Sequence, residues 1–179
     1  MRGRRPGAAV VNPMRRGLLE GAARAFAENG VRGSTMQSVA AAAGVAKATL
    51  YNHFRTKDEV ARELLDLELD RLGSLAAGLP PAQPLAALSD ELGGHPVLRR
   101  IAGTEPALLA VGADRWQVLC GRLAEALGVD ADGAELAARW LLGVVHQPGR
   151  SIDRHRQAAR IAAALTAEPA VQAARSERV

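Results

Sequence analysis

The fold of this chain is decided by residues 34–59, STMQSVAAAAGVAKATLYNHFRTKDE. Apolar residues from Met36 to Ala43 follow the i, i+3, i+4, i+7 spacing of a short amphipathic helix. Gly44 ends this helix, because glycine fits the left-handed position just past a helix terminus. A second short helix is expected over residues 46–54. Two short helices joined by a glycine turn predict a helix-turn-helix, whose second helix lies in the DNA major groove.

The expected second helix carries the polar groups that DNA recognition needs. Hydrogen-bonding groups and one positive charge come from Lys47, Thr49, Tyr51, Asn52 and His53. Leu50 and Phe54 hold the opposite face toward a core, and small Ala46 and Ala48 allow close approach to base edges. The alternative is an ordinary helical hairpin. Composition disfavours it, since a merely solvated helix face usually carries Glu/Lys pairs.

A helix start is expected just before the first of these two helices. Ser34 followed by Gln37 has the spacing of a capping box, and Thr35 lies beside it. The free N–H groups at a helix N-terminus form a phosphate site, so Ser34 or Thr35 is expected to touch the DNA backbone as well as to cap the helix.

A second capping box is expected at Thr56 and Glu59, where a long helix begins. Lys57 then lies in the first turn of that helix, where the helix dipole disfavours a cation. A cation at an unfavourable place suggests an anionic partner. We therefore predict that Lys57 contacts a DNA phosphate.

The string GVAKATLYNHFRTKDEV, residues 44–60, resembles the end of the helix-turn-helix of TetR-family transcriptional regulators. Residues 14–30, MRRGLLEGAARAFAENG, resemble the first helix of that family. The resemblance implies an all-α fold, with an N-terminal three-helix helix-turn-helix DNA-binding domain followed by a C-terminal helical ligand-binding and dimerisation domain. One departure is Ala46, where the family often has Ser. The second helix therefore lacks a side-chain N-cap, which costs roughly 1 kcal/mol of local stability.

The resemblance also implies DNA contacts at family positions that usually approach DNA, namely Thr35, Lys47, Thr49, Tyr51, His53 and Lys57. Residue types and resemblance together give a predicted DNA-binding set of Ser34, Thr35, Lys47, Ala48, Thr49, Tyr51, Asn52, His53 and Lys57.

Charge is distributed unevenly along the chain. Residues 1–57 carry ten Lys/Arg and two acids, a balance of +8, whereas the other 122 residues carry 13 bases and 17 acids, a balance of −4. A basic N-terminal part on an acidic body is typical of a protein whose N-terminal end meets phosphate. A basic N-terminal part could also bind an anionic membrane. The predicted helix-turn-helix makes this the weaker alternative.

The composition of this chain of 179 residues favours a helical protein. Aromatic residues make up only 3%, so Ala and Leu must build the core. We find no run of 18 apolar residues and expect a cytoplasmic protein that does not enter a membrane. Cys120 is the only cysteine, which excludes an internal disulfide and a cysteine-based zinc site.

Four segments are expected. Residues 1–13 form a disordered basic arm, which either follows DNA or serves as a solubilising tail. Residues 14–56 form the helix-turn-helix domain, residues 57–166 a helical effector-binding and dimerisation domain, and residues 167–179 a flexible tail.

The body is expected to contain a long connecting helix from Lys57 to about Gly78, which is broken by the prolines that follow it. Glycine, proline and capping residues then delimit shorter helices at Leu85–Leu92, Pro96–Ala102, Pro106–Val111, Arg115–Leu127, Gly133–His146 and Ile152–Leu165. Asp132 with Glu135 is among the expected caps.

A mostly apolar ligand pocket is expected within this body. Its predicted lining is Leu64, Leu67, Trp116, Cys120 and Trp140. The alternative is that both Trp residues are core or interface anchors. A homodimer is also expected, through a helix-pair face that combines Leu136, Trp140, Val144, Ala158, Ile161, Ala162 and Leu165.

The sequence contains no set of residues that is typical of an enzyme active site. The sequence lacks a phosphate-cradling glycine loop, and His53, His95, His146 and His155 each lack a second ligand at metal-binding spacing. We therefore expect no catalytic residue, metal or cofactor. The sequence predicts a homodimeric regulator, a repressor, that binds a palindromic double-stranded DNA operator and is relieved by a small-molecule effector. The alternative is a nucleoid or architectural DNA-binding protein with no effector.

Overall fold

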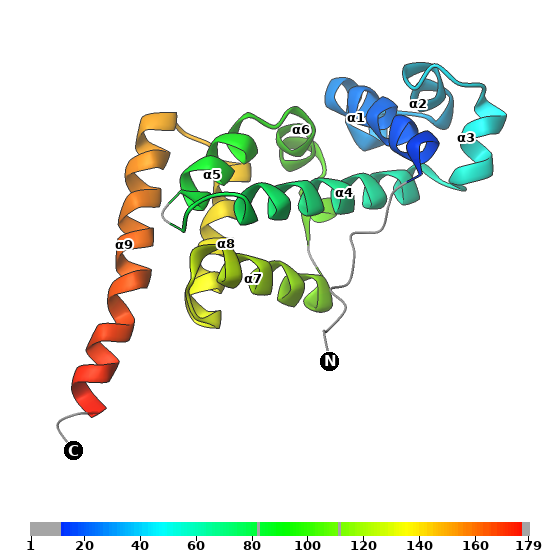
Figure 1. Cartoon of the computed structure of the whole chain (residues 1–179). Coiled ribbons are helices and arrows are strands. Elements are labelled where there is room, and N and C mark those ends of the chain that lie inside the picture. Colours follow the sequence, from blue (N-terminus) through cyan, green and yellow to red (C-terminus); the bar gives the residue numbers. More distant parts are fainter. Residues whose placement is uncertain (1–11, 82, 111, 177–179) are drawn as a thin grey trace, which may run out of the picture. The chain divides into compact units, whose positions relative to one another are not determined.

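Nine α-helices and one short 3₁₀ helix make up the described part of the chain, residues 12–81, 83–110 and 112–176 of a computed structural model (Figure 1). Side chains are described up to residue 166. The elements are α1 (Pro13–Gly33), α2 (Met36–Ala42), α3 (Lys47–His53), α4 (Lys57–Ala77), α5 (Pro84–Gly94), α6 (Pro96–Thr104), η1 (Pro106–Leu109), α7 (Ala113–Leu127), α8 (Ala131–His146) and α9 (Ser151–Ser176). Within these ranges there is no β-strand, so the expected all-α class is confirmed.

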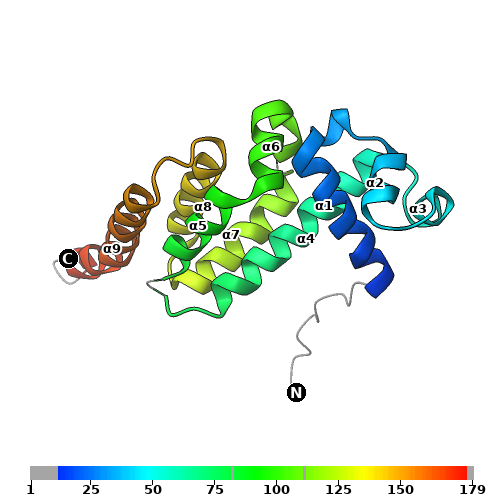
Figure 2. The same cartoon turned by 90° about the horizontal axis from the view of Figure 1, so that it is seen from above.

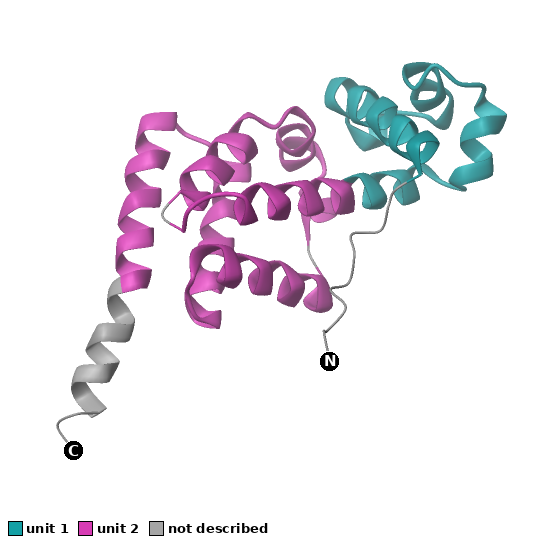
Figure 3. Ribbon diagram, viewed as in Figure 1, with its two compact units in different colours: residues 1–64 teal, residues 65–179 magenta. Residues whose placement is uncertain are grey.

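The chain divides into two compact units, unit 1 ending at Leu64 and unit 2 beginning at Leu65 (Figure 3). This division lies inside α4, whereas the sequence placed a boundary at the start of that helix. The first turns of α4 belong to unit 1, where Val60, Ala61 and Leu64 are buried.

Unit 1 is a small bundle in which α1 packs on α2 and α2 packs on α3. Its largest buried side chains are at most 2% exposed and include Leu18, Leu19, Phe26, Val39, Leu50, Phe54, Val60 and Leu64. α1 and α2 approach closely at Gly21, where an added Cβ would lie 2.4 Å from the Cα and the Cβ of Ala43. Glycine at this position thus sets the distance between the two helices.

The turn between α2 and α3 is closed by backbone hydrogen bonds. Gly44 has φ 69°, the left-handed conformation expected at this position. Its N–H donates to the carbonyl of Ala41, and the N–H of Val45 donates to the carbonyl of Ala40, both at 3.0 Å. This pair of bonds is a Schellman motif, which satisfies the last carbonyls of α2 and directs the chain into α3.

Unit 2 is built around α8, which packs against α7, α5 and α6. Both views of the chain show α7 and α8 side by side (Figures 1 and 2). α9 packs mainly against α5. The core is made largely of Leu, Ala and Val, including Leu85, Leu88, Leu123, Ala134, Ala137, Leu141 and Val145. An aromatic-poor composition thus still gives one continuous helical core.

The helices expected in unit 2 are present, with differences at their ends. The segment expected at 106–111 is a 3₁₀ helix and not an α-helix. The N-cap of α8 is Asp130, whose Oδ1 accepts from the N–H of Gly133 at 2.8 Å. The expected cap at Asp132 was wrong, because the helix begins one residue before it and places Asp132 in the first turn.

Parts of the two predicted terminal segments lie outside the described residues. Of the expected basic arm, residues 1–11 are not described, and Asn12 is the N-cap of α1. The expected flexible tail begins inside α9, whose backbone is helical to Ser176, and residues 177–179 are not described.

Replacing Gly21 by alanine is expected to destabilise unit 1. The added methyl group would overlap the backbone of Ala43 and force α1 and α2 apart, an overpacking effect that typically costs about 1–3 kcal/mol and occasionally more. Thermal unfolding followed by circular dichroism measures the effect.

Gly17 is the matched control, since it lies on the same helix and an added Cβ would meet nothing within 4 Å. Gly17→Ala is expected to leave the melting temperature unchanged or to raise it slightly, because alanine favours a helix interior. Equal melting temperatures for the two variants would contradict the close packing at Gly21.

Candidate DNA-binding interface and ligand cavity

α3 turns one face into unit 1 and the other to solvent. Leu50 is fully buried within it, and Phe54, the C-cap residue, is 1% exposed, so the predicted inward pair is confirmed. The outward residues are Lys47, Ala48, Tyr51 and Asn52, which are exposed, with Thr49 and His53 half-buried. Six of the predicted DNA contacts therefore lie on one short helix.

Two local features of α3 affect its DNA-facing side. The Nζ of Lys47 lies 5.6 Å from the ring centroid of Tyr51, so these exposed side chains form a cation–π pair one helical turn apart. At the start of the helix, Ala46 makes no side-chain capping bond, as the sequence indicated. The order of α3 therefore depends on its packing and not on a cap.

Arg15 of α1 holds the end of α3 and the start of α4. Its Nη1 donates to the carbonyl of His53 at 3.3 Å, and its guanidinium lies 4.4 Å from the ring centroid of Phe54. The same guanidinium forms a two-point ion pair with Glu63 of α4. Hydrogen bonding to Glu63 raises the pKa of Arg15 above its ordinary value.

Sequence reasoning counted Arg15 as one more base in a DNA-facing head and missed this role. The partners of Arg15 lie 38 and 48 residues further along the chain. No local pattern could therefore have indicated the contact.

Ser34 does not cap α2, and the predicted capping box of Ser34 and Gln37 was wrong. The N-cap is Thr35, whose Oγ1 accepts from the N–H of Ser38 at 3.0 Å, while the Ser38 hydroxyl accepts from the N–H of Thr35 at 2.9 Å. Ser34 is 2% exposed, and its hydroxyl donates to the carbonyl of Gly30 at 2.7 Å. Of the two candidates for a phosphate contact, the structure leaves Thr35 exposed.

Lys57 has partners inside unit 1. Its ammonium donates to the carbonyl of Arg32 at 3.0 Å and to the carbonyl of Ser34 at 3.2 Å. The first carbonyl lies in the last turn of α1 and the second belongs to its C-cap residue. The contacts with these two carbonyls therefore explain why a cation lies in the first turn of α4. Thr56 caps α4 as expected, through a bond from the N–H of Glu59 at 3.1 Å.

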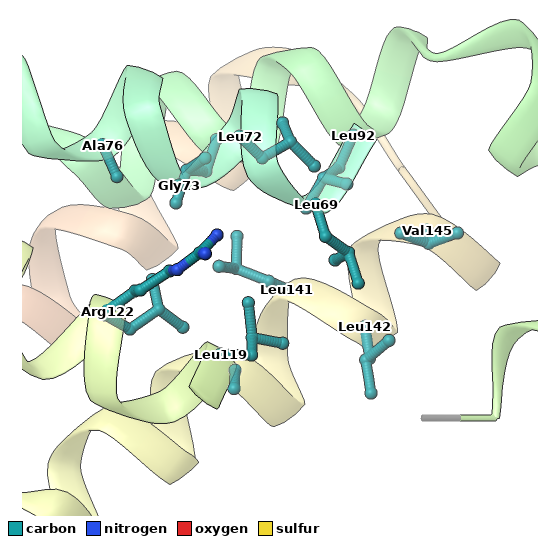
Figure 4. A pocket seen from close by; sticks show the side chains of 13 residues that line it. Leu69, Leu72, Gly73, Ala76, Leu92, Leu119, Arg122, Leu141, Leu142 and Val145 are labelled. Atoms are coloured by element: carbon teal, nitrogen blue, oxygen red, sulfur yellow. The ribbon is translucent and has the colours of Figure 1, made fainter. Parts of the chain in front are cut away.

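Unit 2 contains an apolar cavity of about 70 Å³ among α4, α5, α7 and α8 (Figure 4). Its lining is aliphatic apart from Arg122, and consists of Leu69, Leu72, Gly73, Ala76, Leu88, Leu92, Leu119, Arg122, Leu123, Ala138, Leu141, Leu142 and Val145. A second cavity of about 80 Å³ shares Leu69, Leu72, Leu92, Leu142 and Val145 with the first. Small-molecule sites between helices are lined by apolar side chains in the same way, at larger volumes of about 300–1,000 Å³.

None of the five residues predicted to line a pocket lines either cavity. Leu64 belongs to unit 1 and is 2% exposed, and Leu67 is half-buried. Trp116, Cys120 and Trp140 pack against the edge of the unit 2 core. Sequence reasoning chose them because Trp and Cys combine apolar surface with a polar atom, but helical phase turns leucines of α7 toward the cavity.

Cys120 is half-buried, and burial raises the pKa of its thiol, with the Glu135 carboxylate adding to the effect. A raised pKa keeps the thiol protonated and weakly nucleophilic. This agrees with the interpretation of Cys120 as a packing residue.

Glu68 of α4 lies at the second cavity within a charged network that links three helices. Its Oε2 lies 3.2 Å from the Nε2 of His95 and 2.8 Å from the Nε of Arg71. His95 is the N-cap of α6, where its Nδ1 accepts from the N–H of Leu98 at 3.3 Å. The contact with His95 is the largest cause that lowers the pKa of Glu68 from 4.5 to about 2.

No helix in the described part of the chain has the length and apolarity needed to cross a membrane. Among the same residues, no group of three or more His, Cys, Asp or Glu side chains is arranged to hold a metal ion.

The fold and the exposed face of α3 define a helix-turn-helix protein with a second, all-helical unit. Residues 18–64 match the family model described as bacterial regulatory proteins, tetR family. The N-terminal part of the chain is therefore similar to the DNA-binding part of that family.

Curated relatives match part of the chain. The HTH-type transcriptional repressor KstR2 of Mycobacterium tuberculosis is 46% identical over 65 residues, which is 36% of this chain and 32% of that protein. The HTH-type transcriptional repressor DhaR of Mycobacterium sp. strain GP1 is 34% identical over 93 residues, 46% of this chain and 47% of that protein. The match thus spans about a third to a half of the length of these relatives.

Solved structures extend the likeness in fold to most of the chain. GusR of Salmonella enterica superposes with a TM-score of 0.65 at 19% identity, covering 89% of this chain and 97% of that one. A TetR-family transcriptional regulator from Rhodococcus sp. gives 0.64 at 20% identity, covering 86% and 99%. At these identities the likeness shows the fold alone.

Lys47 and Lys57 are expected to respond differently to removal of their charge. Lys47→Ala is expected to leave the melting temperature unchanged and to lower the slope of log K against log salt by about one on a random-sequence duplex. Lys57→Ala is expected to lower the melting temperature, because two carbonyls of unit 1 lose a charged donor. Fluorescence anisotropy and thermal unfolding measure the two effects. A lower salt slope with unchanged stability for Lys57→Ala would restore the phosphate role.

Glu68 is expected to make stability depend on pH below about 4.5. Because folding lowers its pKa, its contribution is complete above the ordinary value of 4.5 and is lost as pH falls toward about 2. Urea unfolding at several pH values is therefore expected to give wild type a larger free energy of unfolding than Glu68→Gln at pH 7. This difference is expected to shrink as the pH falls from 4.5 toward about 2. Glu125→Gln, at an exposed site on α7, is the control. A difference that does not change with pH would contradict the assignment.

Proposed function

We propose that this protein is a sequence-specific, DNA-binding transcriptional repressor. It acts in the cytoplasm as a homodimer, on a roughly palindromic operator, and a small molecule relieves repression. The observation that carries the proposal is the outward face of α3, where Lys47, Tyr51 and Asn52 are exposed on a helix held from behind by Leu50. Relatives that match about a third to a half of the chain are named transcriptional repressors, which supports the same function.

The DNA contacts divide into two kinds. The N-terminal residues of a recognition helix reach base edges, so we assign this role to Lys47, Ala48 and Thr49, with Asn52 one turn further on. Thr35 lies at the N-terminus of α2, where free N–H groups favour a phosphate. We assign Tyr51 and His53 to contacts with the sugar-phosphate backbone of the DNA.

Ser34 and Lys57 are left out of the proposed contacts. The Ser34 hydroxyl is buried against α1, and the Lys57 ammonium is bound to carbonyls of the same region. Both residues support the interface from within unit 1.

A homodimer would place two recognition helices on one operator. On α8, Leu136 is 55% exposed, and the indole N–H of the neighbouring Trp140 donates to Gln157 of α9 at 3.2 Å. Val144, Ala158 and Leu165, which the sequence assigned to the same face, are buried within the chain's own fold. We therefore assign the dimer contact to the outer side of α8 and α9 around Leu136, Trp140 and Ile161.

Release by a small molecule requires different affinities for two states of the protein. The cavity among α4, α5, α7 and α8 is the proposed effector site. α4 lines this cavity with its C-terminal half and belongs to unit 1 with its first turns. One continuous helix therefore connects the proposed effector site to the DNA-binding unit. This cavity also favours the repressor over the alternative of an architectural DNA-binding protein, which needs no effector.

Selection of DNA from random and genomic pools at about 150 mM salt tests the proposal. We expect a palindromic site that is favoured over scrambled DNA by a factor of roughly a thousand or more. Asn52→Ala is expected to reduce this ratio, whereas Arg99→Gln, at an exposed site on α6, is expected to preserve it. Equal binding of selected and scrambled DNA would overturn the repressor and favour the architectural protein.

A further inference from the structure

We propose that the effector is a linear aliphatic carboxylate, whose chain fills the leucine-lined cavity and whose carboxylate binds Arg122. This inference rests on the effector site of the proposed function and specifies the chemical class of the ligand. It is carried by three observations on the same cavity: its aliphatic walls, the second cavity that continues it, and the position of its one charged side chain.

The walls require a hydrocarbon body. Leucines from four helices surround the space, and Arg122 is the one charged residue among those that line it (Figure 4). A ligand with hydroxyl or amide groups along its length would lose hydrogen bonds to water without replacement, which is unfavourable. A saturated hydrocarbon chain makes no hydrogen bonds to water and therefore loses none on binding.

The shape favours a chain over a ring. The cavity of about 70 Å³ is smaller than the roughly 150 Å³ of an engineered apolar cavity that holds benzene. The second cavity, of about 80 Å³, shares Leu69, Leu72 and Leu142 with the first, and its lining also includes the charged residues Glu68 and Arg115. Rotation of these leucine side chains would join the two spaces end to end, and a narrow chain needs only such small changes.

Arg122 stands at the boundary between the cavity and an open cleft. The cleft, of about 340 Å³, lies between α4 and α7 and shares Leu69, Leu119 and Arg122 with the cavity. The Nη1 of Arg122 is 2.5 Å from the Oδ1 of Asp70, and the two side chains are 46% and 65% exposed. Exposed ion pairs contribute little to stability, so a ligand carboxylate can replace Asp70 as the partner.

Gly73 makes room for this arginine on the surface of α4. A Cβ at position 73 would lie 3.3 Å from both the Cδ and the Nη1 of Arg122. Glycine is an unfavourable residue in a helix interior, and here the arginine stem occupies the space that a side chain would fill. Gly73→Ala thus offers a way to shift Arg122 without removing its charge.

The charge of the headgroup follows from which groups reach the cavity. Three aspartates, Asp66, Asp70 and Asp114, line the cleft, but none of them lines the cavity. Arg122 lines both. A headgroup at the cleft end of a chain that fills the cavity therefore lies beside Arg122, and a carboxylate is the group that a guanidinium binds best.

Isothermal titration of the full chain without DNA tests the inference, with hexanoate, octanoate, octanol and octylamine as probes. We expect octanoate to bind at least tenfold more tightly than octanol, and octylamine to bind least. Affinity is expected to rise about fourfold for each methylene until the joined cavities are full.

Variants separate the headgroup contact from the chain contact. Arg122→Gln is expected to remove the preference for octanoate over octanol while octanol still binds. Gly73→Ala is expected to fold at least as stably as wild type and to weaken octanoate several-fold. Arg156→Gln is the control, because Arg156 is also an exposed arginine paired with an aspartate, Asp153, but on α9. It is expected to leave octanoate binding unchanged.

Tighter binding of octylamine, equal binding of octanoate to wild type and Arg122→Gln, or no binding of any probe would overturn the inference. None of these results affects the selection of operator DNA, which tests the repressor separately. Release of a selected operator by octanoate, with no release from Arg122→Gln, would join the two proposals.

Discussion

The guanidinium of Arg15 is the interaction on which the arrangement of unit 1 depends. It joins the first turn of α1 to the carbonyl that ends α3 and to a carboxylate in α4, and it covers the ring of Phe54. A planar group with several fixed donors can hold three elements at once, whereas a lysine ammonium lacks that geometry. The close approach of α1 and α2 at Gly21 fixes the other side of the bundle. Between these two contacts, α3 has little freedom to turn its polar face away from solvent.

Much of this fold is visible in the sequence, because helix ends are encoded locally. Gly44 and the turn that it closes, the inward pair of Leu50 and Phe54, and the helices of unit 2 could be predicted from spacing and punctuation. The errors arose where two local solutions compete or where distant residues meet. Ser34 with Gln37 fits the usual capping-box pattern and Thr35 with Ser38 does not, yet burial of Ser34 against α1 leaves Thr35 as the cap.

Long-range contacts also explain why the ligand cavity was misplaced. Periodicity shows that a face of α7 or α8 is apolar, but not which of its residues points into a space left by other helices. The cavity is bounded by leucines that look like ordinary core residues in the sequence. Trp116 and Trp140 attracted attention by their chemistry but lie at the edge of the core. Packing defects belong to the assembled unit, and so they leave no trace in a single segment.

The absence of a side-chain cap on α3 has a consequence for protein engineering. A helix of seven residues with an alanine N-cap would not stay folded as a free peptide, since short helices are marginal even in favourable sequences. Its order is supplied from behind, through Leu50, Phe54 and the arginine of α1. The α3 segment therefore cannot be transplanted alone into another protein. Specificity would instead be exchanged by grafting only the outward residues of another helix-turn-helix protein onto this backbone, leaving the supporting residues as they are.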